Sequence, residues 1–162
     1  MHDGPAYTAE TNGILIRVRP SYLAGQSDPD EGRWVWAYQI EIVNLTGSTV
    51  QLMARRWTIT DGHGHVEEVR GPGVVGQTPT IPPGGSFNYT SGCPLKTPQG
   101  IMVGSYQMVG DDGRMIDVAI PAFSLDSPGL VRVLAPLGIV RGKHLHTGTT
   151  ETFRTVAAAA DD

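Results

Sequence analysis

The chain has 162 residues, with 12 lysines and arginines against 16 aspartates and glutamates, and a formal net charge of -4. This length predicts one compact domain with terminal extensions, and the shortage of cations argues against binding to the phosphate backbone of nucleic acids. The single cysteine, Cys93, excludes an internal disulfide and favours a reducing compartment.

Membrane and secretion signals are also missing from the sequence pattern. No stretch approaches the ~18 consecutive apolar residues of a membrane-spanning helix, and the segment MHDGPAYTAE at the start has neither a basic nor an apolar signal region. We therefore expect a soluble, cytoplasmic protein without membrane association.

Short alternating runs separated by glycine and proline dominate the first third of the chain. Ile14, Ile16 and Val18 share one face of a predicted strand that Pro20 ends. A longer strand is predicted over residues 34–43. Its aromatic and β-branched residues at even positions, Trp34 to Ile42, alternate with the residues at odd positions, Val35 to Val43. Both runs have the period of two that is typical of half-buried strands.

A change of phase marks the next strand. Val50 and Leu52 predict one inward face, whereas Trp57 and Ile59 fall on the opposite parity, so we expect a bulge near Arg55-Arg56. The segment Asp61-Gly62-His63-Gly64 predicts a hairpin turn that leads back into a strand over residues 65–69.

The second half repeats this style. Strands are predicted over residues 86–90, over 102–108 with a break at Gly104, and over 116–120, where Pro121 ends the run and leaves a short segment over 123–125. In all, seven to eight strands recur at intervals of about ten residues, without helical periodicity. The sequence thus predicts an all-β, immunoglobulin-like or fibronectin type III-like antiparallel sandwich over residues 1–128. Residues 129–162 are expected to form a partly packed or flexible C-terminal extension.

The segment Gly71-Pro-Gly-Val-Val-Gly76 matches the G-x-G-x-x-G pattern of dinucleotide sites. Such sites require a helix after the glycines, and the following residues, rich in proline and glycine, exclude one. Two interpretations stay open: an exposed nest of backbone amides that binds phosphate weakly, with Arg70, Arg55, Arg56 or Lys96 nearby, or a connector that needs glycine geometry. The connector is the better supported of the two.

Catalytic and metal-binding patterns are weaker. Asp61, His63 and His65 recur at every second position, but the predicted turn breaks their alternation, so these histidines are weak metal candidates; His144 and His146 form a second pair. Cys93 and Ser91 have no partner of suitable spacing and are interpreted as a core residue and a turn residue. No cofactor and no catalytic residue is predicted.

Many ordered glycine, proline and aromatic positions carry a family resemblance. They include Gly71-Pro-Gly-Val-Val-Gly76, Ile81-Pro-Pro-Gly84, Phe87-Asn-Tyr-Thr-Ser-Gly92, Thr97-Pro-Gln-Gly-Ile-Met102 and Ile120-Pro-Ala-Phe-Ser-Leu125. With these residues, the chain resembles the ApaG family from about Tyr7 to Pro128. The resemblance implies a fibronectin type III-like fold, no established enzymatic activity and an association with cobalt and magnesium homeostasis.

The resemblance also implies two kinds of binding. Related domains look like protein-interaction modules, and the family's glycine-rich loop has been suggested to bind pyrophosphate. By position, that suggestion falls on Gly71, Gly73, Val74, Val75 and Gly76, with Arg70 and Arg56 beside them.

Three functions follow, in order of preference. The first is a non-enzymatic module that binds an unknown protein partner through its loops or sheet edges, an arrangement that also permits a homodimer. The second is a sensor of pyrophosphate or a nucleotide phosphate at residues 71–76. The third is a metal-dependent phosphoester hydrolase that uses His63 and His65. This function ranks last because the sequence lacks the acidic cluster that Mg²⁺-dependent phosphate chemistry needs.

Overall fold

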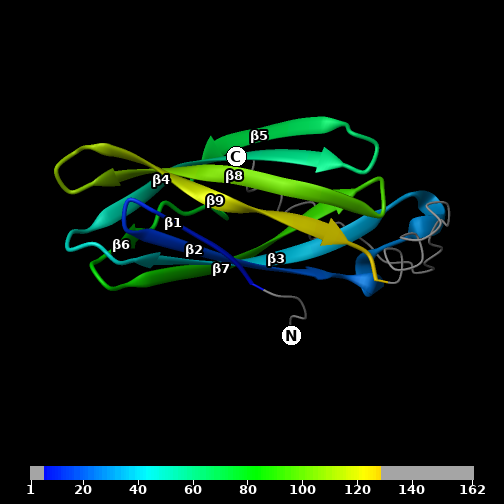
Figure 1. The fold of residues 1–162 in the computed structure, drawn as a ribbon, viewed down its shortest axis with the longest axis horizontal. Helices are drawn as coiled ribbons and strands as arrows, with labels where there is room; N and C mark the ends of the chain where they lie inside the picture. The colour runs from blue at the N-terminus through cyan, green and yellow to red at the C-terminus, as the bar shows by residue number, and fades with distance from the viewer. Residues whose placement is uncertain (1–5, 129–162) are drawn as a thin grey trace.

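Two antiparallel sheets stacked face to face make up residues 6–128, the part of the chain that the computed structural model describes (Figure 1). The first sheet has the strand order β1-β2-β3-β7, and the second has the order β5-β4-β8-β9, with β6 also pairing with β4. The strands are β1 (Tyr7–Thr11), β2 (Ile14–Tyr22), β3 (Trp34–Asn44), β4 (Val50–Asp61), β5 (Val66–Pro72), β6 (Thr80–Ile81), β7 (Ser86–Leu95), β8 (Gln99–Gly110) and β9 (Met115–Asp126). Two single-turn 3-10 helices, η1 (Ala24–Gln26) and η2 (Pro29–Glu31), join β2 to β3.

The predicted antiparallel β-sandwich is therefore confirmed, with nine strands in place of seven to eight. The count was low because Tyr7–Thr11 and Thr80–Ile81 show little hydrophobic alternation. The predicted turn at Asp61–Gly64 is present as the connection β4–β5, and a second tight turn at Asp111–Gly113 connects β8 to β9.

The core lies between the sheets and is built from the alternate positions of each strand. Tyr38 of β3 meets Trp57 of β4 edge to face, with ring centroids 5.4 Å apart, and Trp57 meets Phe123 of β9 at 5.9 Å. Edge-to-face contacts of this kind add to the burial of apolar area. The two layers are thus joined through large aromatic side chains near their centre.

Proline and bulge positions differ from the prediction. Strand β2 continues through Pro20, which pairs with Tyr38 and lies beyond the end of β1. A proline is tolerated there because only one side of the strand has a neighbour. Likewise, β9 continues through Pro121, because the register against β8 jumps from Ile120 to Phe123 and leaves the proline in a bulge.

The bulge in β4 also lies earlier than predicted. The register shifts between Leu52 and Ala54, not at Arg55-Arg56. The reason is that Arg55 points into the core on the same face as Trp57, with only 1% of its surface exposed. After the bulge, the inward-facing side chains of β4 therefore begin with an arginine, a residue type that is rarely buried.

Candidate functional site

The glycine segment connects β5 to β6 through a tight turn. β5 ends at Pro72, opposite Ala54 of β4. Val74 and Gln77 then exchange two backbone hydrogen bonds of 2.8 and 2.9 Å, which close a turn around Val75 and Gly76. The next element after Gly76 is strand β6 and not a helix, as the sequence predicted.

Positive φ angles explain why glycines occupy this segment. Gly73 has φ of +61°, and a Cβ added there would lie 2.2 Å from the carbonyl oxygen of Gln77. In the turn, φ is +41° at Val75 and +80° at Gly76, the combination of a type I′ turn. A β-branched residue is strained in this region, so Val75 is held there by the surrounding structure, against which its side chain packs.

Arg55 holds the segment from the inside. Its Nη1 donates to the carbonyl oxygen of Pro72 at 2.8 Å and to that of Gly73 at 3.1 Å. The carbonyl groups at the start of the segment are therefore directed at a buried cation. Arg55 does not join the exposed positive charge that the sequence allowed it to supply.

Most amides of the segment are also engaged. The amide of Gly73 donates to the carbonyl oxygen of Met53, and that of Val74 donates to Gln77. Among residues 73–77, the amides of Val75 and Gly76 in the turn have no backbone acceptor in the described part of the chain. The assignment of Gly71, Gly73, Val74, Val75 and Gly76 to an anion stays a prediction, and two of these amides are free to carry it.

Two arginines do come together on the surface. Arg56 of β4 lies directly opposite Arg70 of β5, and both are exposed. They line a surface hollow of about 390 Å³ together with Ala54, Arg55, Gly71, Gln107 and Asp117. Arg70 also approaches Glu68 at 3.5 Å. Like charges directly opposite each other on neighbouring strands are unfavourable, so this hollow suits an anionic group.

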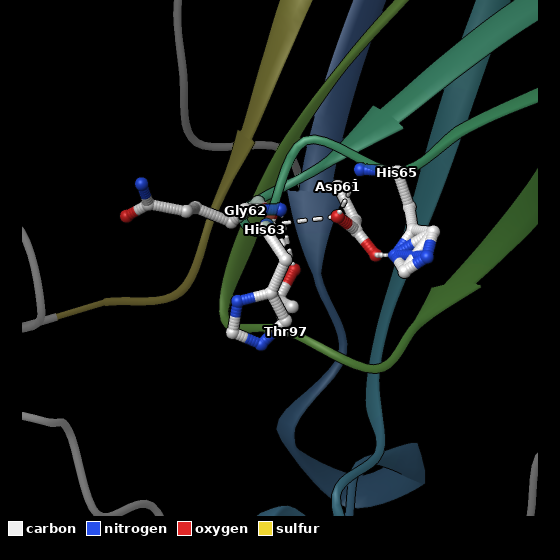
Figure 2. A network of polar contacts seen from close by, with 6 residues as sticks. Asp61, Gly62, His63, His65 and Thr97 are labelled. Carbon is white, nitrogen blue, oxygen red and sulfur yellow. Dashed lines mark hydrogen bonds and ion pairs between the residues drawn. The ribbon is translucent and has the colours of Figure 1, made fainter.

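The turn between β4 and β5 places the predicted metal candidates (Figure 2). Oδ1 of Asp61 accepts from the backbone amides of His63 at 2.8 Å and His65 at 3.0 Å, and Oγ1 of Thr97 accepts from the amide of Gly62. Figure 2 shows the two imidazole rings on opposite sides of this turn, with only His65 beside the Asp61 carboxylate. The Asp61 carboxylate and the Thr97 hydroxyl thus bind backbone amides of the turn. The described residues contain no cluster of three or more metal-ligating side chains.

Electrostatics at this turn follow from the same bonds. Desolvation raises the pKa of the Asp61 carboxyl, but the amide hydrogen bonds from His65 and His63 and the nearby imidazoles outweigh it. The pKa of Asp61 therefore lies below its ordinary value.

Lys96 lies on this side of the molecule, in a second hollow with His65 and Glu67, and does not line the Arg56–Arg70 hollow. His144 and His146 lie outside the described residues.

Sequence comparison identifies the family. The ApaG domain model matches residues 24–110. The protein ApaG of Brucella anthropi is 58% identical over 128 residues, which cover 79% of this chain and 98% of that protein. The chain belongs to the ApaG family. The Protein ApaG of Azorhizobium caulinodans is 56% identical with the same coverage.

Solved structures agree with the family fold. A Bordetella pertussis structure described as an ApaA protein is 46% identical, with a TM-score of 0.70, and the match covers 72% of this chain and 94% of that one. The structural genomics target SoR45 is 40% identical with a TM-score of 0.69, covering 85% and 100%. The matched ApaG domain contains all the candidate residues between Arg55 and Lys96.

Candidate nucleophiles of this ApaG-family chain lie in the core. Cys93 is buried, and this burial, with a smaller contribution from the Glu67 carboxylate, raises the pKa of its thiol to about 12. Ser91 is also buried, and it lies within β7 opposite Tyr38, so its interpretation as a turn residue was wrong. A thiol that stays protonated at neutral pH is a poor nucleophile, which agrees with the interpretation of Cys93 as a core residue.

One feature of the ApaG domain escaped the sequence analysis. The outer face of the second sheet exposes Ile101 and Val103 of β8, at 51% and 40%. The run Ile101-Met102-Val103 is apolar at consecutive positions, and such a run indicates a strand with apolar groups on both faces. That signal was present in the sequence. No helix in residues 6–128 is long and apolar enough to cross a membrane.

Proposed function

We propose that this chain is a non-enzymatic module that binds a protein partner through the outer face of its second sheet. The observation that carries the proposal is the distribution of exposed apolar groups in residues 6–128. The large hydrophobic side chains exposed there are Leu45, Met53, Val66, Ile101, Val103 and Met115. All except Leu45 lie on that one face, because they alternate with buried residues of β4, β8 and β9 or face outward from β5.

Register brings three of these side chains together. Thr60 of β4 lies between Val66 of β5 on one side and Ile101 of β8 on the other. Val103, two residues along β8, lies opposite Thr58. Val66, Ile101 and Val103, with Thr60 and Thr58 beside them, form what we call the apolar patch. Contiguous exposed apolar surface rimmed by polar groups is typical of protein-interaction sites.

The outer face of the first sheet has a different character. It pairs Arg17 of β2 with Glu41 of β3 in an ion pair, and Gln39, Asn88 and Thr90 are exposed beside it. Covering a polar face of this kind with a partner would bury little apolar surface and would therefore gain little hydrophobic free energy. The contrast between the two faces supports binding at the second sheet and supplies a control surface.

Paired substitutions test the proposal. Proteins that the chain retains from an extract of its own cells would be cross-linked to it and identified. Each candidate partner would then be purified, and its affinity for the wild-type chain and for the variants would be measured by titration. We expect Ile101→Glu and Val103→Glu to weaken a true partner at least about tenfold, since each buries a charge in the interface. Thr90→Glu, on the polar face of the first sheet, should leave the affinity unchanged. A partner whose affinity is the same for all three variants would refute binding at the apolar patch.

We also propose a cytoplasmic location, because the single cysteine, Cys93, has no partner for an internal disulfide and fits a reducing compartment. In this proposal, any influence on cobalt or magnesium homeostasis is exerted through the bound protein.

A second candidate function is the binding of a phosphate-containing anion such as pyrophosphate. The observation that favours it is the Arg56–Arg70 hollow, which adjoins Gly71. Titration with pyrophosphate should shift the amide resonances of Arg56, Arg70, Gly71 and Gly76, and Arg56→Gln with Arg70→Gln should abolish the shift. Because exposed arginine–phosphate contacts are weak, the titration needs to reach about 10 mM. Unchanged spectra at that concentration would exclude this function.

A further inference from the structure

Strand β5 forms an open edge of the second sheet (Figure 1). It pairs with β4 on one side, and no strand among residues 6–128 pairs with its other side. Its side chains are exposed or half-buried throughout. A seven-residue edge in this state offers unpaired backbone groups to another strand.

Hydrogen bonds of the β4–β5 ladder show which groups face outward. The amide of Asp61 donates to His65, and that of Gly73 donates to Met53. In an antiparallel pair, hydrogen-bonded positions alternate with positions whose amide and carbonyl point away from the neighbour. With the observed register, Val66, Glu68 and Arg70 are therefore the residues that direct both backbone groups to the open edge. Pro72 has no amide proton, so the edge available for pairing ends there.

Charge discriminates between the registers in which two copies of β5 could pair antiparallel about a two-fold axis. A pairing centred on Glu68 sets that carboxylate opposite its own copy, and one centred on Arg70 does the same with two guanidinium groups. A pairing centred on Val69 sets Glu68 of each copy opposite Arg70 of the other, twice. Opposite charges across strands are favourable and like charges are unfavourable.

We propose that β5 joins the β5 strand of a second copy of this chain, antiparallel and centred on Val69. This pairing extends the second sheet across the two-fold axis. It uses the backbone edge of β5, which shares only Val66 with the apolar patch. Glu68 and Arg70 are both hydrogen-bonded positions in it, so the two pairs together form four backbone hydrogen bonds.

Neighbouring side chains agree with this register. The side chain of Val69 points to the core side, where it packs against the buried cluster, and in the dimer it lies opposite its own copy. On the outer face, the row Arg56–Arg70 of one chain continues into Glu68 of the other. The unfavourable pair of arginines within each chain thus gains a carboxylate neighbour.

Complementary charge variants provide the decisive test. Sedimentation of the full chain between about 10 µM and about 1 mM, a range suited to a small interface, should show a monomer–dimer equilibrium that added salt weakens. Arg70→Glu alone and Glu68→Arg alone should each weaken self-association at least about tenfold, because each sets like charges opposite. A mixture of equal amounts of these two variants should dimerise again, since every pair across the axis is then complementary.

Two further measurements check this interpretation. The amide protons of Glu68 and Arg70 should exchange more slowly with solvent at high protein concentration. As a control, Arg19→Glu, on the outer face of the first sheet, should leave the dimerisation constant unchanged. A chain that stays monomeric throughout, or a mixture that does not restore the dimer, would overturn the proposal. Ile101→Glu should leave self-association intact, so the loss of partner binding and the loss of the dimer are separable.

Discussion

The guanidinium of Arg55, on the core side of β4, donates a 2.8 Å hydrogen bond to the carbonyl oxygen of Pro72, the last residue of β5. The same nitrogen reaches the carbonyl of Gly73. A buried cation thus terminates the edge strand and sets the direction of the glycine segment that follows. This segment is an organised connector whose backbone groups are mostly used inside the fold.

Replacement of Arg55 by methionine should lower the free energy of unfolding by about 2–4 kcal/mol, since two buried carbonyl groups lose a charged donor. Methionine retains much of the side-chain volume, so lost packing contributes little. Urea denaturation measures the change. The control is Arg56→Met at the exposed neighbouring position, for which a change within about 0.5 kcal/mol is expected. Equal stabilities of the two variants would show that the bonds to Pro72 and Gly73 contribute no net stability.

Gly73 and Gly76 form a matched pair for testing the shape of the connector. Both have positive φ, but a Cβ at Gly76 would meet nothing within 4 Å, whereas one at Gly73 would lie 2.2 Å from a carbonyl oxygen. Gly76→Ala should cost about 1–2 kcal/mol from backbone conformation alone. Gly73→Ala should cost about 1–3 kcal/mol more, because the backbone must move. Thermal or urea unfolding of the two variants would contradict this geometry if Gly76→Ala were the more destabilised.

The hydroxyl groups of Tyr89 and Tyr106 lie 2.5 Å apart between the sheets. Burial raises the pKa of both phenols, so that both hydroxyls stay protonated at neutral pH and one donates to the other. Tyr89→Phe or Tyr106→Phe alone leaves an unpaired buried hydroxyl and should cost about 1–3 kcal/mol. The double variant should cost less than the sum of the two, a coupling that a double-mutant cycle measures. Strict additivity would mean that the two hydroxyls do not act as a pair.

Much of the fold could be predicted because period-two alternation is clean wherever one face is buried and the other is not, as in residues 34–43. Prediction failed where a residue type contradicted its position. Arg55 points inward and Pro20 pairs within a strand, and both were interpreted by the usual behaviour of their residue types. Neither outcome follows from local sequence, since each depends on what lies across the sheet.

The candidate site shows the same division. The turn at Asp61–Gly64 was predicted, and it fixes the register of β4 against β5, so the position of Arg56 opposite Arg70 was within reach of the sequence. The apolar patch was not, because it gathers residues from β5, β4 and β8, and the pairing of β4 with β8 spans a long stretch of chain. Long-range strand pairing is what a single sequence constrains least.

Asp61 makes the stability of the β4–β5 turn depend on pH. Its pKa is lower in the folded chain than its ordinary value, in spite of desolvation, because the amides of His65 and His63 bond to the carboxylate. The stabilisation is therefore fully present above the unfolded pKa of about 4 and is lost as the pH falls through the folded pKa. Asp61→Asn keeps a side-chain oxygen for these amides but cannot titrate. The gap in unfolding free energy between wild type and Asp61→Asn should thus stay constant from about pH 7 to about pH 5 and narrow below about pH 4. Urea unfolding at a series of pH values checks this, and a gap that persists unchanged to about pH 2.5 would show that the charge of Asp61 contributes nothing.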